Sequence, residues 1–104
     1  MDENELLTRV TEDKDFVRRL LEDRLDDWEV AKEWAELVLR IEPEDLVHRL
    51  ALVRAHRHLG QTSLAISELE KCQRIIESGN VGVVDRDVVI PMVEGEKRLL
   101  LPSR

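Results

Sequence analysis

The sequence has a single cysteine, Cys72, among its 104 residues. One thiol cannot form an intramolecular disulfide or a metal site built from several cysteines. The chain also has no apolar run of about 18 residues, and no leader in which a charged segment precedes an apolar one. We therefore expect a cytoplasmic protein that does not bind or span a membrane.

Residues that favour turns and β-strands are scarce. The chain has four glycines, three prolines, no tyrosine and only three aromatic residues, Phe16, Trp28 and Trp34. Apolar residues make up 42% and charged residues 38% of the sequence, which is the balance of a globular domain with a heavily solvated surface. This composition predicts an all-α protein, and the length is that of one domain.

Acidic residues dominate the first part of the chain. Residues 1–45 carry 16 acids and 7 bases, a net charge of −9, whereas residues 46–60 carry three arginines, three histidines and no acid. The remaining residues are close to neutral, with 7 acids and 6 bases. A nucleic-acid partner is not expected, because contacts with phosphates need an extended basic surface.

Apolar spacing predicts two helices in the acidic part of the chain. Thr11 with the acids that follow is a suitable N-cap for the first, which extends to Leu25, and residues 3–10 read as a short preceding helix. The second runs from Trp28 to Ile41, where Pro43 stops it. The apolar residues of the first helix recur at helical spacing: Phe16, Val17, Leu20, Leu21 and Leu25.

Two further helices follow the proline. Asp45 can cap a helix over about Leu46–Leu59, which Gly60 ends in the left-handed conformation that glycine favours. Thr62 or Ser63 begins the next helix, which Ser78-Gly79-Asn80 ends. Its inner stripe places Cys72 in the core.

The C-terminal residues allow two interpretations. Asp85 or Asp87 could cap a last helix in which Pro91 lies in the first turn. Alternatively, the β-branched run Val81–Val84 could pair with Val88–Ile90 as a ribbon. We favour the helix.

The chain repeats its pattern at a spacing of 34 residues. This shift places Ala31 on Ala65, Leu25 on Leu59 and Ile41 on Ile75. The sequences Asp27-Trp28-Glu29-Val30-Ala31, Leu39–Pro43 and Leu59-Gly60 with Ala65 resemble motifs of the tetratricopeptide repeat family, whose helix–turn–helix unit has this length. The chain departs from the family pattern at Asp26, where glycine is usual, and at Val53, where a small residue is usual.

The resemblance implies antiparallel helical hairpins stacked in a short right-handed superhelix. On this basis the 104 residues form a single domain with an N-terminal extension at 1–11, repeats at 12–45 and 46–79, and a helical or irregular C-terminal cap at 80–104. Because three or more repeats are usual in a stable stack, the terminal segments or a second copy of the protein must cover the repeat ends. We therefore expect either capping by the terminal segments or a homo-oligomer.

The resemblance also implies a binding face, because the family grips peptides in a concave groove lined by the first helix of each repeat. Two arginines on such a wall could bind carboxylates of an acidic peptide or the C-terminus of a partner protein. The alternative is that Arg54 and Arg57 pair with acids of the same protein, such as Glu22 or Asp23. The predicted partner-binding residues are Val47, Leu50, Arg54, Arg57, His58, Phe16 and Leu20.

The sequence gives little support for a metal site, a catalytic triad or a phosphate-binding loop. The histidines His48, His56 and His58 lie on one predicted helix without an acid or cysteine, so we expect neither a metal site nor a catalytic triad. Residues Gly79 and Gly82 lack the lysine of a phosphate loop, and no cofactor is expected. We predict a non-enzymatic adaptor or chaperone-like module that binds a protein segment, or alternatively a self-associating or capping domain of a larger, regulatory protein without a free ligand.

Overall fold

The computed structural model describes residues 14, 16–25, 27–79, 81–82 and 85–101. Lys14 and residues 16–21 are helical and are called the first helical segment below. The described residues contain no strand, which confirms the predicted all-α class. The later elements are α2 (Trp28–Ile41), α3 (Leu46–His58), α4 (Thr62–Glu77), the π-helical turn η1 (Asp85–Val89) and α5 (Ile90–Leu100).

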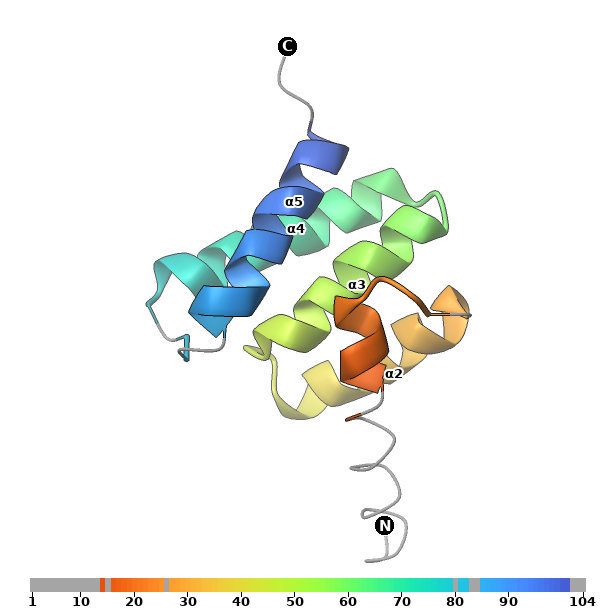
Figure 1. Cartoon of the computed structure of the whole chain (residues 1–104), viewed down its shortest axis with the longest axis horizontal. Coiled ribbons are helices and arrows are strands. Elements are labelled where there is room, and N and C mark those ends of the chain that lie inside the picture. The colour runs from red at the N-terminus through yellow and green to blue at the C-terminus, as the bar shows by residue number, and fades with distance from the viewer. Residues whose placement is uncertain (1–13, 15, 26, 80, 83–84, 102–104) are drawn as a thin grey trace, which may run out of the picture.

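Helix α3 is the centre of the molecule. It packs between α2 and α4, and α5 with η1 contacts both α3 and α4 (Figure 1). Nine of the 13 residues of α3 are buried, including Arg54, His48 and His56. A helix buried on most of its circumference can contain charged residues only if other elements supply their partners.

Two apolar clusters lie on different sides of α3. One joins α3 to α4, η1 and α5 through Leu46, Leu50, Val53, Leu69, Cys72, Val89 and Val93. The other joins α3 to the first helical segment and α2 through Leu20, Ala35, Leu39, Ala51 and Leu52. The prediction that Cys72 is a core residue is confirmed, because its side chain is fully buried.

Sequence signals located the central helices closely. Helix α2 has the predicted bounds, and α3 ends one residue before the predicted Leu59, which is its C-cap. The Asp45 carboxylate accepts a hydrogen bond from the backbone N–H of His48 at 3.2 Å, as expected of an N-cap. Asp27 caps α2 in the same way, by accepting from the N–H groups of Glu29 and Val30.

The end of α3 has the geometry predicted for Gly60. Its φ angle is +74°, and its N–H donates to the carbonyl of Arg57 at 3.1 Å. The N–H of Gln61 donates to the carbonyl of His56 at 2.8 Å. These two bonds form a Schellman motif, in which a left-handed residue satisfies the last helical carbonyls.

The first helical segment ends earlier than predicted, because the same motif forms at Asp23. Asp23 has a φ angle of +56°, its N–H donates to the carbonyl of Leu20, and the N–H of Arg24 donates to that of Arg19. Aspartate tolerates this conformation better than most residues do. The turn therefore lies three residues before Asp26, the position that aligns with Gly60, and the prediction of a helix extending to Leu25 is wrong.

The favoured C-terminal helix is present, and it excludes the alternative β-ribbon. Val88 and Val89 belong to η1 and Ile90 begins α5, so the segment proposed as the second strand is helical. Pro91 lies in the first turn of α5, as predicted. The prediction that Asp85 or Asp87 caps this helix is wrong, because its N-cap is Val89 and no side chain caps it. The π-helical turn directly before it fits the proline, which has no N–H to donate to the preceding turn.

Some predictions fall outside the described residues, namely the helix at 3–10, the cap at Thr11 and the conformation of Val83 and Val84. Among the described residues, no helix is both long and apolar enough to cross a membrane.

Candidate functional site

Two arginines of α3 converge on one carboxylate of α5. Arg54 and Arg57 are three residues apart and therefore lie on the same side of the helix. Nε of Arg54 donates to Oε1 of Glu96 at 2.9 Å. Arg57 donates through Nε to Oε2 at 2.6 Å and through Nη2 to Oε1 at 3.0 Å. Glu96 thus accepts three charge-assisted hydrogen bonds from two guanidinium groups.

The group is shielded from solvent. Arg54 is 8% exposed and Glu96 is 2% exposed. Nη1 of Arg54 also donates to the backbone carbonyl of Leu20 at 2.6 Å. This carbonyl belongs to the last turn of the first helical segment, where helices have incomplete backbone hydrogen bonding and a negative dipole end. Arg54 therefore links the first helical segment, α3 and α5.

The left-handed residue Asp23 extends the network toward solvent. Its Oδ2 accepts from Nη2 of Arg57 at 3.3 Å, and its Oδ1 lies 3.0 Å from Nε2 of His58. The imidazole ring of His58 stacks on Trp28, with ring centroids 4.1 Å apart and planes inclined by 8°. The Schellman turn at Asp23 therefore directs a carboxylate at the C-terminal end of α3.

Electrostatic effects in this network favour the charged forms. Burial raises the pKa of Asp23, but the hydrogen bond with His58 and the charges of Arg54, His58 and Arg57 outweigh it, so the pKa lies below its ordinary value. Burial likewise disfavours the cationic form of Arg57, yet the contacts with Glu96 and Asp23 raise its pKa. The pKa shifts of Asp23 and Arg57 thus both favour the charged ion pair between them.

The structure places the predicted partner-binding residues around α3, largely inside the protein and divided between the two apolar clusters. Leu20 and Leu50 are fully buried in the two apolar clusters, and Phe16 and Val47 pack against these clusters as partly buried residues. Arg54 and Arg57 are occupied by Glu96, and His58 lies at the more exposed edge with Asp23.

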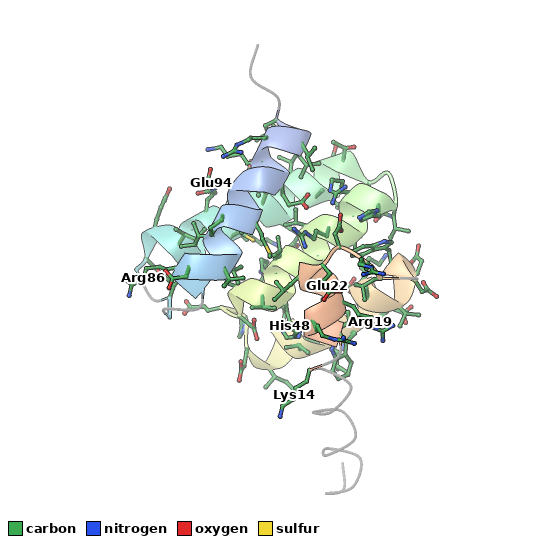
Figure 2. The ribbon with its side chains drawn as sticks, in the orientation of Figure 1. Lys14, Arg19, Glu22, His48, Arg86 and Glu94 are labelled. Carbon is green, nitrogen blue, oxygen red and sulfur yellow. The ribbon has the colours of Figure 1, made fainter. Side chains whose placement is uncertain are left out.

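Of the two acids named as internal partners, Asp23 pairs with Arg57. The other, Glu22, lies at the end of the first helical segment (Figure 2), where its carboxylate is 3.9 Å from Arg24. The sequence reasoning missed Glu96, the most important acid of the site. A signal was available: Val89, Val93 and Glu96 are spaced as i, i+4 and i+7, so this acid falls on the apolar face of the C-terminal helix.

The third arginine of the basic stretch is also paired. Nη1 of Arg49 donates to Glu68 of α4 at 2.9 Å, and its Nη2 donates to the carbonyl of Pro43 at 2.7 Å. These contacts lie on the other side of α3 from Arg54, beside an open depression. The depression is lined by Glu36, Leu39, Arg40, Arg49, Leu52, His56 and Glu68. Each of the three arginines in residues 46–60 therefore forms an ion pair with an acid from another part of the protein.

The described residues offer few groups that could bind a metal ion or act as a nucleophile. No group of three or more histidine, cysteine, aspartate or glutamate side chains is placed there to hold a metal ion. Burial raises the pKa of the Cys72 thiol to about 12, so the thiolate that acts as a nucleophile is nearly absent at neutral pH.

No protein-family model, curated protein or solved structure matches the sequence. The resemblance to tetratricopeptide repeats therefore rests on the sequence pattern and stays a prediction.

Proposed function

We propose that this protein is a cytoplasmic protein-interaction module that holds a segment of a partner protein on the Arg54–Arg57 face of α3. The observation that carries the proposal is that two guanidinium groups of this face already bind a carboxylate presented by another helix. Apolar residues next to them, among them Leu50 and Val53, pack against that same helix. Apolar anchors beside charged groups that set orientation are the usual means of protein recognition.

The chemistry of the face favours binding over proton transfer. Arginine stays protonated at any physiological pH and cannot act as a general base. Both carboxylate oxygens of Glu96 are already hydrogen-bonded to the two guanidinium groups. If the family resemblance is correct, the role is that of an adaptor or chaperone-like repeat protein with an acidic protein segment as its partner.

Affinity capture from the native cell lysate tests this proposal. The wild type is compared with Arg57→Gln and with Arg98→Gln, a matched control because Arg98 is exposed on α5. Arg57 is chosen because Arg54 has its own ion pair with Glu96, which we expect to persist when Arg57 is replaced. Circular dichroism first establishes that both variants are folded.

We expect a partner that the wild type and Arg98→Gln retain and that Arg57→Gln loses or binds more weakly. If all three proteins capture the same partner equally, the Arg54–Arg57 face is not the binding site.

Self-association is the second candidate function, and exposed apolar residues of α2 favour it. Ile41 is 77% exposed and Val30 is 59% exposed. Sedimentation analysis over a range of protein concentrations tests this role, with Ile41→Ser as the variant. Association that Ile41→Ser weakens supports a structural role, and a monomer at every concentration excludes self-association through this surface.

A further inference from the structure

The C-terminal helix buries one face against the rest of the protein. Val89, Val93 and Glu96 are almost fully buried, whereas Lys97, Arg98 and Leu99 are exposed. The spacing of the three buried residues, four and then three, places them on one side of a helix. This arrangement is that of an amphipathic helix lying on a groove, with two aliphatic anchors followed by an acid.

The three buried residues contact the face of α3 to which we assign partner binding. Val89 and Val93 belong to the same apolar cluster as Leu50 and Val53. Glu96 accepts the hydrogen bonds of Arg54 and Arg57. A partner segment that bound both guanidinium groups as Glu96 does would therefore need to take the place of Glu96.

We propose that α5 is an internal counterpart of the partner's binding segment and that the partner displaces it. The partner segment is then an amphipathic helix with two aliphatic residues four positions apart and a glutamate three positions further along. This inference rests on the proposed function and adds the chemistry of the partner and its competition with α5.

The arrangement of the helices permits such an exchange. Helix α5 is the last described element and packs on α3 and α4, while α3 packs on both α2 and α4 without it. The cluster formed by Leu20, Ala35, Leu39, Ala51 and Leu52 contains no residue of α5. Release of α5 thus leaves one of the two apolar clusters intact.

An internal helix suppresses binding of an external one. A segment tethered to its site has an effective concentration in the millimolar range, so a free segment of equal intrinsic affinity competes poorly with it. Only molecules in which α5 is released can bind the partner. The apparent affinity is therefore the intrinsic affinity multiplied by the fraction of such molecules. Weakening the contact between Glu96 and the two arginines should therefore increase the affinity for an added helix.

A glutamate within a helix fits this site better than the terminal carboxylate of a partner protein. Both oxygens of Glu96 are used, and the carboxylate is buried beside aliphatic residues of its own helix. Val89 lies nearly two helical turns before the acid, so the apolar and charged contacts are spaced for a helical ligand.

The experiment uses a fluorescent peptide with the sequence of residues 85–101 and a second peptide with glutamine in place of Glu96. Each is titrated with full-length wild type, Glu96→Gln and Glu94→Gln. Glu94 is the matched control, because it lies on the outer side of α5, away from α3 (Figure 2), and has no hydrogen bond with the arginines. Fluorescence anisotropy measures binding, and circular dichroism establishes that each protein is folded.

We expect the unmodified peptide to bind Glu96→Gln about tenfold or more tightly than it binds the wild type or Glu94→Gln. The glutamine peptide should lose most of this gain. Hydrogen exchange on the wild type needs no substitution: an excess of the unmodified peptide should accelerate exchange of the α5 amides without accelerating that of α2.

Equal affinity of the peptide for the three folded proteins would overturn the inference, as would unchanged exchange in α5. An exchanged dimer of Glu96→Gln would also overturn it, because the occupant would be a second copy of the protein. The capture experiment above is independent of these results. A partner lost by Arg57→Gln would still support the proposed function if it contacted the exposed part of the Arg57 side chain beside a docked α5.

Discussion

Nε of Arg54 lies 2.9 Å from Oε1 of Glu96, although 42 positions separate the two residues in the sequence. The pair is almost completely removed from solvent, and Arg57 shares the same carboxylate. Taking charges out of water is costly, so each member of such a group depends on the others. Docking of the C-terminal helix therefore depends strongly on Glu96.

Replacing Glu96 by alanine should strongly destabilise the protein. The substitution leaves Arg54 buried without its carboxylate, a change that costs about 3–5 kcal/mol in comparable buried pairs. Glu94→Ala on the outer side of the same helix should change the free energy of unfolding by about 0.5 kcal/mol or less. Urea unfolding followed by circular dichroism measures both. Similar losses for the two variants would mean that the buried network contributes no more than an ordinary surface residue.

Two glycine substitutions should have opposite effects. An added Cβ meets no atom within 4 Å at either Gly60 or Gly95, so conformation alone decides the outcome. Gly60 has a φ angle of +74°, and Gly60→Ala should cost about 1–2 kcal/mol. Gly95 lies within α5, where Gly95→Ala should stabilise the protein by about 0.5–1 kcal/mol. Thermal unfolding measures the midpoint temperature of both variants. A shift of this temperature in the same direction for Gly60→Ala and Gly95→Ala would contradict the expected opposite effects.

Asp23 should contribute stability that acid removes. Its pKa is lower in the folded protein than in the unfolded state, where aspartate titrates at about 3.9. The unfolded state therefore binds more protons than the folded state as the pH falls. The contribution is complete well above that pH and is lost as the pH falls through the lowered pKa.

Asp23→Asn should therefore reduce the acid sensitivity of the unfolding midpoint. The carboxylate is partly exposed, so we expect an effect at neutral pH of about 1 kcal/mol or less. Asn also tolerates a positive φ, which keeps the turn. Asp87→Asn, at an exposed position of η1, is the control and should leave the midpoint–pH curve unchanged. An equal change of the midpoint–pH curve in Asp23→Asn and Asp87→Asn would show that Asp23 contributes no more acid sensitivity than an exposed aspartate.

The thiol of Cys72 should report on the docking of α5. It is fully buried in the cluster that includes Val89 and Val93, and its pKa is about 12. A thiol-specific reagent should therefore react slowly with the native protein and much faster after unfolding in denaturant. Glu96→Gln, which weakens docking of α5, should increase the native rate, whereas Glu94→Gln should not. Equal rates in the two variants would show that opening near Cys72 does not involve Glu96.

Local sequence signals accounted for much of the secondary structure. Asp45 and Gly60 act within a few residues of their own position, through a cap and a left-handed turn, so the sequence predicts them without knowledge of the fold. The turn at Asp23 was missed because a glycine was expected at the turn and the repeat register pointed to Asp26 instead. Aspartate marks a left-handed position less clearly than glycine does.

The sequence by itself determined an all-α protein, the bounds of α2, the burial of Cys72 and the presence of arginines and apolar residues on one side of α3. These properties follow from composition, helical periodicity and capping, which act over short distances along the backbone. Only the tertiary structure decided that Glu96, rather than a solvent-exposed groove, meets Arg54 and Arg57. That contact depends on how α5 packs against α3, and no local rule relates residues 42 positions apart.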